Sequence, residues 1–212
     1  MSIRIEVATR RDLQEVAALL ATTMENDAIF LDVIPPRQRR HEAMLGFFEA
    51  YVLTYAGPER SVDIARRDDG VIVGAATWAY NRAGRDSRFG EQLALAPRYL
   101  RALGPLGVIP PYRVQKVLER HRPLDTHWFL SAVGVLGAER DAGVGTELVG
   151  SRLAAIDDAY EDVYVESSTM HDRRFFERLG FIPGAVIQGL DHARPVGMFR
   201  PPARRRRRND VD

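Results

Sequence analysis

The 212-residue sequence contains no cysteine, so it can form no disulfide, thiolate metal site or cysteine nucleophile. Its five histidines are scattered, without the spacing of a metal-ligand set. No apolar run approaches the roughly 20 residues that a membrane-spanning helix needs. The first residues read as a strand rather than as a signal peptide. We therefore expect no metal, no membrane partner and a cytoplasmic location.

The composition is otherwise that of an ordinary globular domain, with 45% apolar and 28% charged residues. The length suits one sizeable core, so we expect a single domain over residues 3–200. The net charge of +1 conceals an uninterrupted arginine run at 204–208. We expect residues 201–212 to be a disordered, Arg-rich tail. This tail lacks interleaved aromatic residues, so we interpret it as a solvated terminus and expect no nucleic-acid partner.

Periodicity predicts strands alternating with helices along the chain. Strands are expected at 3–7, 61–66, 71–78, 129–136, 162–167, 185–190 and 196–199. Helices are expected at 13–24, after Pro35–Pro36, near 93–103, at 114–120 and after Gly145. Between the third strand and the fourth, residues 81–111 form an insertion that is long for a compact domain. We expect this segment to be a flap on the substrate side.

The stretch from Phe129 to Asp158 carries the clearest functional signal. An apolar strand is followed by a turn containing Gly143 and Gly145, and then by a helix with apolar residues at helical spacing. The first amides of a helix have no intrahelical partner, and the helix dipole is positive there. Glycines allow an anion close approach to these amides. The pattern favours a phosphate-cradling strand–turn–helix, although the glycines could serve only a tight turn and close packing.

Two familiar phosphate motifs do not fit this turn. A P-loop requires Lys followed by Ser or Thr after its last glycine, and here Thr146 follows Gly145 without a lysine. A dinucleotide-binding fingerprint requires a third glycine three residues on, where this chain has Leu148.

The sequence does resemble the coenzyme A signature of the GNAT N-acetyltransferase superfamily. The resemblance is carried by Val133-Gly-Val135, by Arg140-x-x-Gly143-x-Gly145-x-x-Leu148, and by the second hallmark, Phe175-Phe-Glu-Arg-Leu-Gly-Phe181. With His121-Arg-Pro, Trp128-Phe-Leu and Val165-Glu-Ser, these segments are similar to the puromycin N-acetyltransferases and their relatives. The likeness runs from about Ile5 to Met198 and is densest from His121 to Phe181.

The resemblance implies an α/β (α+β mixed) GNAT fold. Such a fold is one domain with a mixed, twisted central sheet, splayed at the acetyl-CoA site and covered by helices on both faces. It also implies acetyl-CoA as the cofactor, with its diphosphate on the turn amides and its pantetheine arm along the fourth strand. The expected cofactor-binding residues are Val133, Gly134, Val135, Arg140, Asp141, Ala142, Gly143, Val144, Gly145, Thr146, Asp172 and Phe176. Relatives have Gly where this chain has Asp141, and a carboxylate there opposes phosphate unless it points to solvent.

The implied activity is transfer of acetyl from acetyl-CoA to the primary amine of a small molecule, directly within a ternary complex. Glu166 matches the Glu of the family's Leu-Glu-Thr-Ser pattern and is the expected base, acting through water. Its alternative is a structural carboxylate satisfied by backbone donors or by an arginine. A backbone N–H near Val135 is expected to polarise the thioester carbonyl.

The family's general acid is a tyrosine, and this chain has Phe176 in its place. Three explanations remain open. Coenzyme A could leave without an acid, or Tyr80, Tyr164 or Ser168 could replace the missing tyrosine. The third explanation is an alternative function, an acyl-CoA-binding protein with little or no turnover.

The acceptor site is expected between two segments. Asn26, Asp27 and Phe30 follow the first helix, and Trp78 and Tyr80 end the third strand. Aromatic walls with carboxylates suit a cationic, ring-bearing amine, such as an aminonucleoside or another antibiotic-like amine. Antibiotic resistance would follow from such an acceptor. Trp78 could equally be a core residue, and the chain is expected to be a monomer or homodimer.

Overall fold

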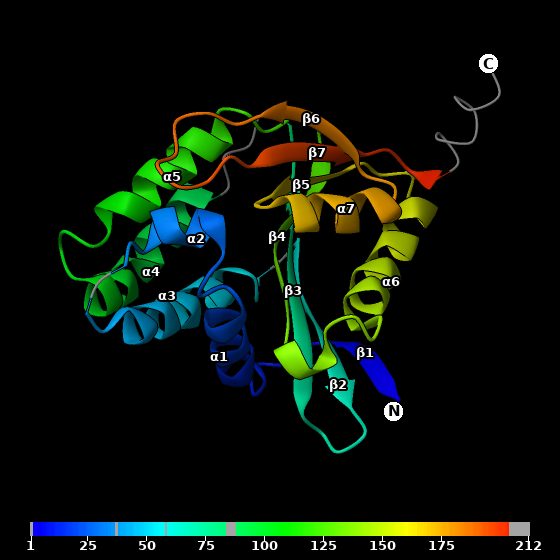
Figure 1. Cartoon of the computed structure of the whole chain (residues 1–212), viewed down its shortest axis with the longest axis horizontal. Coiled ribbons are helices and arrows are strands. Elements are labelled where there is room, and N and C mark those ends of the chain that lie inside the picture. The colour runs from blue at the N-terminus through cyan, green and yellow to red at the C-terminus, as the bar shows by residue number, and fades with distance from the viewer. Residues whose placement is uncertain (1, 37, 58, 84–87, 204–212) are drawn as a thin grey trace.

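The structure is a computed structural model that describes residues 2–36, 38–57, 59–83 and 88–203. Its centre is a seven-stranded sheet with the order β1-β2-β3-β4-β5-β7-β6 (Figure 1). The strands are β1 (Ile3–Val7), β2 (Arg60–Arg67), β3 (Ile72–Asn81), β4 (His127–Val135), β5 (Val163–Ser167), β6 (Ile182–Val186) and β7 (Val196–Arg200). Strands β4 and β5 are parallel, whereas the other neighbouring pairs are antiparallel. The expectation of a mixed sheet is confirmed.

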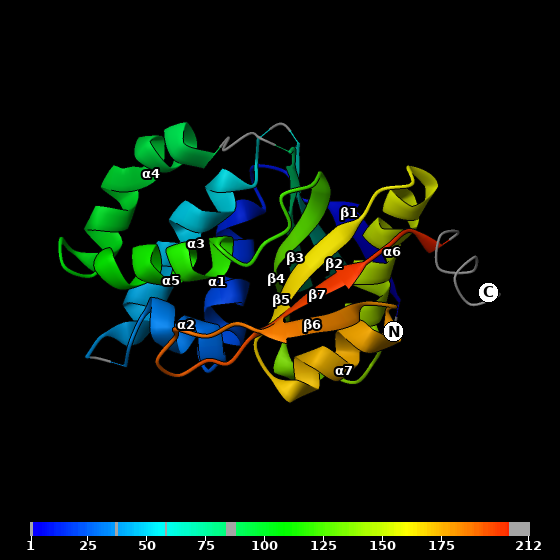
Figure 2. The same ribbon diagram turned by 90° about the horizontal axis from the view of Figure 1, so that it is seen from above.

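Helices cover both faces of the sheet (Figure 2). The helices α1 to α5 gather on one face, and α6 and α7 lie on the other. Their bounds are α1 (Leu13–Thr23), α2 (Ala28–Val33), α3 (Arg40–Thr54), α4 (Arg88–Leu103), α5 (Ile109–Glu119), α6 (Val144–Asp158) and α7 (Met170–Arg178). Burial of apolar side chains against the sheet forms a hydrophobic cluster on each face, and this burial is the main stabilising term of such a layered fold.

The expected hairpin is present between β2 and β3. Its turn places Gly70 at a φ of +90°, a left-handed conformation that glycine adopts without steric cost. The Gly70 N–H donates to the Arg67 carbonyl at 2.8 Å. The local Asp-Gly signal was therefore sufficient to predict this turn.

Three expected boundaries need correction. Helix α3 begins at Arg40 rather than at Pro35–Pro36, and the short helix α2 fills part of the preceding segment. Strand β6 begins at Ile182, before the expected 185–190. Helix α5 begins at Ile109, inside the segment expected to be a flap. Local end signals are weak at these three places, so tertiary contacts decide the boundary of each element.

The short helix α2 is joined to the loop before β7 through the buried side chain of Asp32. Its carboxylate accepts hydrogen bonds from the backbone N–H groups of Asp191, His192 and Ala193 and from the His192 ring. These hydrogen bonds join two segments that are about 160 residues apart in sequence.

The end of the described chain extends into residues that were expected to be disordered. Pro201 and Pro202 are buried, and the Ala203 N–H donates to Asp157 at 2.9 Å. The arginine run at 204–208 lies outside the described residues, as do residues 84–87 of the expected flap. No helix in the described part of the chain is long and apolar enough to cross a membrane.

Candidate active site

The sheet opens at one defined position between β4 and β5. These two strands pair through only three residue pairs, and the pairing ends at Leu130 opposite Val165. At the same level, β4 has one extra residue, Ser131, because Thr77 opposes Ala132 while Trp78 opposes Leu130. Such a bulge ends regular pairing and bends the strand. Beyond it, β4 and β5 diverge, as the expectation of a splayed sheet required.

A cleft of about 1150 Å³ occupies this opening and continues between the helices of one face. Its cofactor end, as we name it, is lined by residues of β4, of the turn before α6 and of α7. These are Val133, Gly134, Val135, Arg140, Asp141, Gly143, Gly145, Thr146, His171, Asp172, Phe175 and Phe176. Most of the residues that the sequence suggested for coenzyme A therefore lie along one continuous wall.

The start of α6 provides open hydrogen-bond donors to the cleft. Gly143 is the N-cap residue with a φ of +84°, and no side chain of the described chain caps the helix. The N–H groups of the first turn therefore remain available, next to the positive end of the helix dipole. Arg140 adds a positive side chain beside them. These groups fit an anion such as a diphosphate.

The turn before α6 explains the unusual Asp141. This residue has a φ of +62°, in the left-handed region that favours glycine, which is the residue that the resemblance implies at this position. Aspartate is one of the few residues with a side chain that visits this region readily. The Asp141 side chain is exposed, so its carboxylate has access to solvent.

The free edge of β4 offers a second kind of contact. The Leu136 N–H donates toward β3, to the Val73 carbonyl at 2.9 Å. Because successive N–H groups of a strand alternate in direction, those of Val135 and Val133 point toward the cleft. An extended, amide-bearing chain can pair with such an edge as an added strand. The edge therefore fits a pantetheine arm.

Not every expected cofactor residue faces the cleft. Ala142 is exposed and outside the cleft lining, and the Val144 side chain is buried in the hydrophobic cluster beneath α6.

The Asp172 carboxylate accepts from the N–H and hydroxyl of Thr169, which caps α7. Gly134 permits close packing, because a Cβ there would lie 2.2 Å from the Thr23 hydroxyl.

Glu166 lines the cleft but is held by an arginine. Arg122, just after α5, donates to both oxygens of the carboxylate, from Nε at 2.6 Å and from Nη2 at 2.9 Å. Only 11% of the Arg122 side chain and 6% of the Glu166 side chain are exposed. The guanidinium also lies 4.1 Å from the centroid of the Phe129 ring. Burial alone would lower the pKa of Arg122, but the charge and hydrogen bonds of Glu166 raise it above its usual value.

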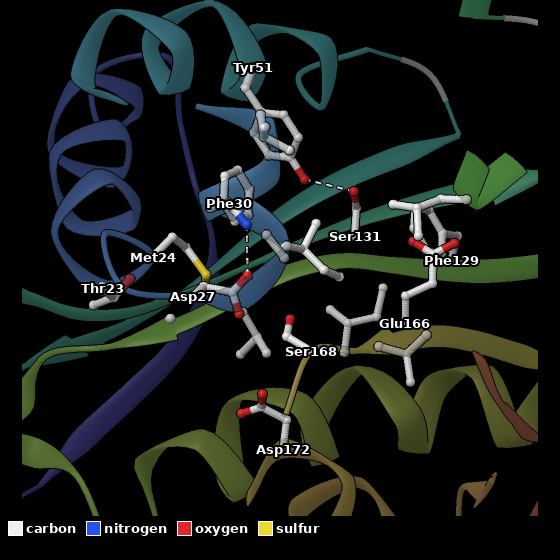
Figure 3. A pocket seen from close by; sticks show the side chains of 18 of the residues that line it. Thr23, Met24, Asp27, Phe30, Tyr51, Phe129, Ser131, Glu166, Ser168 and Asp172 are labelled. Atoms are coloured by element: carbon white, nitrogen blue, oxygen red, sulfur yellow. Dashed lines mark hydrogen bonds between the residues drawn. The ribbon is translucent and has the colours of Figure 1, made fainter. Parts of the chain in front are cut away.

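Asp27 is the second carboxylate that faces the centre of the cleft. One oxygen, Oδ1, accepts from the Phe30 N–H at 3.1 Å and caps α2. Figure 3 shows the carboxylate directed toward Ser168, with Asp172 beyond. Burial raises the pKa of Asp27, a hydrogen bond from Ser168 opposes the rise, and the negative charge of Asp172 adds to it. Asp27 therefore holds a proton more readily than an ordinary aspartate.

The other end of the cleft is an aromatic chamber, which we define by the lining residues Phe30, Phe47, Tyr51, Tyr55 and Tyr99. Rings in this set lie 4.9 to 6.0 Å apart between neighbouring centroids. They come from α2, from α3 and the residue that follows it, and from α4. The Tyr51 hydroxyl donates to the Ser131 hydroxyl at 2.7 Å, which joins the chamber to the bulge of β4 (Figure 3).

The structure does not bring Trp78 and Tyr80 to the cleft. Trp78 is fully buried in the hydrophobic cluster on the α6 face, on the far side of the sheet. The Tyr80 hydroxyl donates to Glu161 at 2.6 Å, and its ring packs on Trp128. The reason is strand alternation along β3, because Ala75 and Ala79 face the cluster beneath α1 to α5 while Trp78 faces the opposite one. Their expected place in the acceptor site is therefore not retained.

Sequence reasoning missed Arg122 and the chamber residues of α3 and α4. Arg122 lies in the quoted His121-Arg-Pro segment, but its pairing with Glu166 joins residues 44 positions apart. The signal for the chamber was the aromatic content of α3, where rings at 47, 48, 51 and 55 occupy more than one helical face. A helix with aromatic side chains on more than one face packs against more than one neighbour, so some of these rings were available to line a cavity.

Known protein-family models were searched, and none matches this chain. Several solved structures have the same fold. A protein described as histone acetyltransferase HPA2 and related acetyltransferase, from Corynebacterium glutamicum, is 27% identical, with a TM-score of 0.74 over 96% of this chain and 98% of that one. Arylalkylamine N-acetyltransferase 2 from Aedes aegypti is 16% identical, with a TM-score of 0.64 over 95% of this chain and 99% of that one.

An acetyltransferase of the GNAT family from Staphylococcus aureus is 13% identical, with a TM-score of 0.55 over 94% of this chain and 99% of that one. The expected fold class is confirmed by these neighbours, whereas the narrower likeness to puromycin N-acetyltransferases is not shown by them. The chain has the fold of the GNAT acetyltransferases.

Proposed function

We propose that this protein is an acetyl-CoA-dependent N-acetyltransferase that acts on the primary amine of a small molecule. The observation that carries the proposal is the cleft itself. One continuous opening joins uncapped amides at a helix N-terminus, a free strand edge and an aromatic chamber with a carboxylate. The GNAT neighbours, which match along more than nine-tenths of the chain, support acetyl transfer in general.

The chain's own residues would hold acetyl-CoA along the wall from Val133 to Thr146. The first-turn amides of α6 and Arg140 bind the diphosphate, and the edge of β4 binds the pantetheine arm. When bound, acetyl-CoA supplies the acetyl thioester. The backbone of β4 between Val133 and Val135 would orient the arm, because an added strand pairs along the edge that it meets. A backbone N–H of this edge, near Val135, would be the group that polarises the acetyl carbonyl.

The acceptor occupies the aromatic chamber and presents its amine to the centre of the cleft. The chamber walls are apolar rings, and Asn26, Asp27 and Phe30 line the passage between them and the cofactor end. A ring-bearing amine gains stacking and apolar burial there, and its nitrogen lies near a carboxylate. This chemistry supports an aminonucleoside or another antibiotic-like amine, as for the puromycin N-acetyltransferases. Helices α4 and α5, which include part of 81–111, form a substrate-side flap over the chamber.

The absence of a tyrosine at Phe176 leaves the departing thiolate without the family's usual acid. Of the three substitutes considered, Ser168 lines the cleft. Tyr80 is bonded to Glu161, and the Tyr164 ring is buried outside the cleft lining. We propose that transfer proceeds without a dedicated tyrosine acid, at a cost of roughly 10²-fold. The second candidate, an acyl-CoA-binding protein with little turnover, is favoured by this same substitution.

A thiol-release assay with a panel of ring-bearing and aliphatic primary amines separates the two functions. Calorimetric titration with acetyl-CoA accompanies it. Binding together with coenzyme A release from at least one amine, and an acetylated product by mass spectrometry, supports the transferase. Binding without release from any amine supports the acyl-CoA-binding alternative. Absence of binding would remove both.

A further inference from the structure

We propose that Asp27, rather than Glu166, is the proton acceptor for the amine, and that the Arg122–Glu166 pair is a positioning element of the cleft wall. The inference rests on the proposed acetyl transfer and assigns a residue to one of its steps. The amine enters this step neutral. Its nitrogen bonds to the acetyl carbon while the C–S bond breaks with its electron pair on sulfur. The N–H proton passes to Oδ2 of Asp27, from which it can return to the thiolate.

Glu166 is poorly suited to this role because both of its oxygens are already occupied. Arg122 donates to Oε1 at 2.6 Å and to Oε2 at 2.9 Å, in a setting where both side chains are almost fully covered. Protonation of the carboxylate would leave a buried guanidinium without its counter-charge. Breaking a buried ion pair by neutralising one partner is strongly destabilising, because the other charge stays buried without compensation. A proton acceptor that loses this stabilisation on each turnover is at a disadvantage.

Asp27 has the opposite surroundings. It forms no ion pair with any residue that the structure describes, and only its Oδ1 is used in capping α2. The neighbouring groups are the Ser168 hydroxyl, after β5, and the Asp172 carboxylate, on α7. A nearby negative charge favours the protonated form of a carboxyl group. The pKa of Asp27, raised by burial and by Asp172, is thus shifted toward the working range of a base.

The remaining charged groups around the cleft lie on other elements. They are Arg60 on β2, Glu139, Arg140 and Asp141 before α6, His171 and Arg178 on α7, and the mutually paired Arg122 and Glu166. Besides burial, the negative charge of Asp172 raises the pKa of Asp27. Asp27 also lies between the cofactor end and the aromatic chamber, which is where an amine and a thioester must meet (Figure 3).

The capping role of Asp27 allows a clean substitution. Asparagine caps helices about as well as aspartate, so Asp27→Asn keeps the N-cap acceptor and removes only the ability to take a proton. Asp27→Glu keeps the carboxylate. Glu166→Gln serves as the matched control, since it removes the other carboxylate of the cleft while keeping an amide oxygen toward Arg122.

The test is the pH profile of kcat/KM for wild type and the three variants, with an amine from the panel and acetyl-CoA. Asp27→Asn should lower kcat/KM by about 10² to 10⁴-fold. It should also abolish the acid limb, which is the fall of kcat/KM at low pH caused by protonation of the base in the free enzyme. Asp27→Glu should recover roughly tenfold or more of that loss. Glu166→Gln should lose thermal stability but keep the acid limb. Acetyl-CoA affinity, measured by calorimetry, should be unchanged in Asp27→Asn.

A second readout does not depend on turnover. In protein labelled with ¹³C at aspartate carboxyl groups, the Asp27 resonance is the one that is missing from the spectrum of Asp27→Asn. Its chemical shift should titrate with a pKa above the usual aspartate range, at the same pH as the midpoint of the acid limb of kcat/KM. An Asp27→Asn enzyme within a few-fold of wild type, or loss of the limb in Glu166→Gln instead, overturns the assignment. A wild type that binds acetyl-CoA but acetylates no amine overturns the proposed function itself, and the assignment with it.

Discussion

Replacing Gly145 with alanine tests whether the first turn of α6 holds a diphosphate. An added Cβ would lie 3.6 Å from Phe175 and from Val135, which is ordinary van der Waals contact, so the unliganded protein should fold normally. Both of these side chains line the cleft, and the new methyl group would intrude between them. An anion displaced from the amides loses charge-assisted hydrogen bonds worth about 1.5–3 kcal/mol. We therefore expect acetyl-CoA affinity to fall roughly 10- to 150-fold.

Gly150→Ala is the matched control on the same helix. No atom lies within 4 Å of its added Cβ, and Gly150 is not among the residues lining the cleft. Alanine in place of a helical glycine stabilises by about 0.5–1 kcal/mol, which corresponds to about 1–4 °C in Tm for a chain of this size. Gly150→Ala should show this rise with unchanged affinity for acetyl-CoA, by calorimetry and thermal melting.

The comparison has a clear adverse outcome. If Gly145→Ala binds acetyl-CoA as tightly as wild type while melting at or above the wild-type temperature, the diphosphate does not lie on these amides. The proposed cofactor site would then be refuted without any question of misfolding.

Three further predictions concern single side chains. Asp141→Gly should tighten acetyl-CoA binding with little change in Tm, because glycine adopts the left-handed region freely but aspartate also visits it readily, and glycine gains entropy in the unfolded chain. Arg122→Ala should lower the free energy of unfolding by about 3–5 kcal/mol in urea titrations, since it leaves Glu166 buried and unpaired. Burial alone would raise the pKa of Asp32, but the backbone N–H groups of the loop before β7 and the His192 ring outweigh it, and the pKa is lowered. A depressed carboxyl pKa stabilises the fold above the unfolded value of about 3.9 and less so as pH falls below it. Asp32→Asn should therefore cost stability at pH 7 and progressively less in more acid solution.

Each of these has a control or an opposing result. Asp141→Asn keeps a residue that tolerates the left-handed region, so it should tighten binding with little change in Tm. Weaker binding in both Asp141 variants would contradict the charge argument. A solvent-exposed ion pair contributes at most about 1 kcal/mol to the free energy of unfolding. If Arg122→Ala lowers that free energy by no more than this, the argument from a buried ion pair is contradicted. A destabilisation by Asp32→Asn that is independent of pH would contradict the linkage.

The sequence alone determined the local features of the fold. The hairpin turn at Gly70 and the strand–turn–helix around Gly143 depend on backbone conformations and periodicities set by neighbouring residues. The two motifs of the coenzyme A resemblance also lie within short segments. The GNAT fold class could therefore be predicted from local patterns together with that resemblance.

The tertiary structure decided which side chains meet. Glu166 was expected to be the base, with a carboxylate satisfied by an arginine as the alternative, and only the fold shows that Arg122, distant in sequence, holds both of its oxygens. Trp78 was expected near the acceptor, but the alternation of side chains along β3 leaves it in the opposite hydrophobic cluster. Asp27 gains its burial and its negative neighbour only when α2 is placed opposite α7. A carboxylate's sequence neighbours do not set its charge environment, because electrostatic interactions and desolvation depend on distance in space, and only the folded chain fixes that distance.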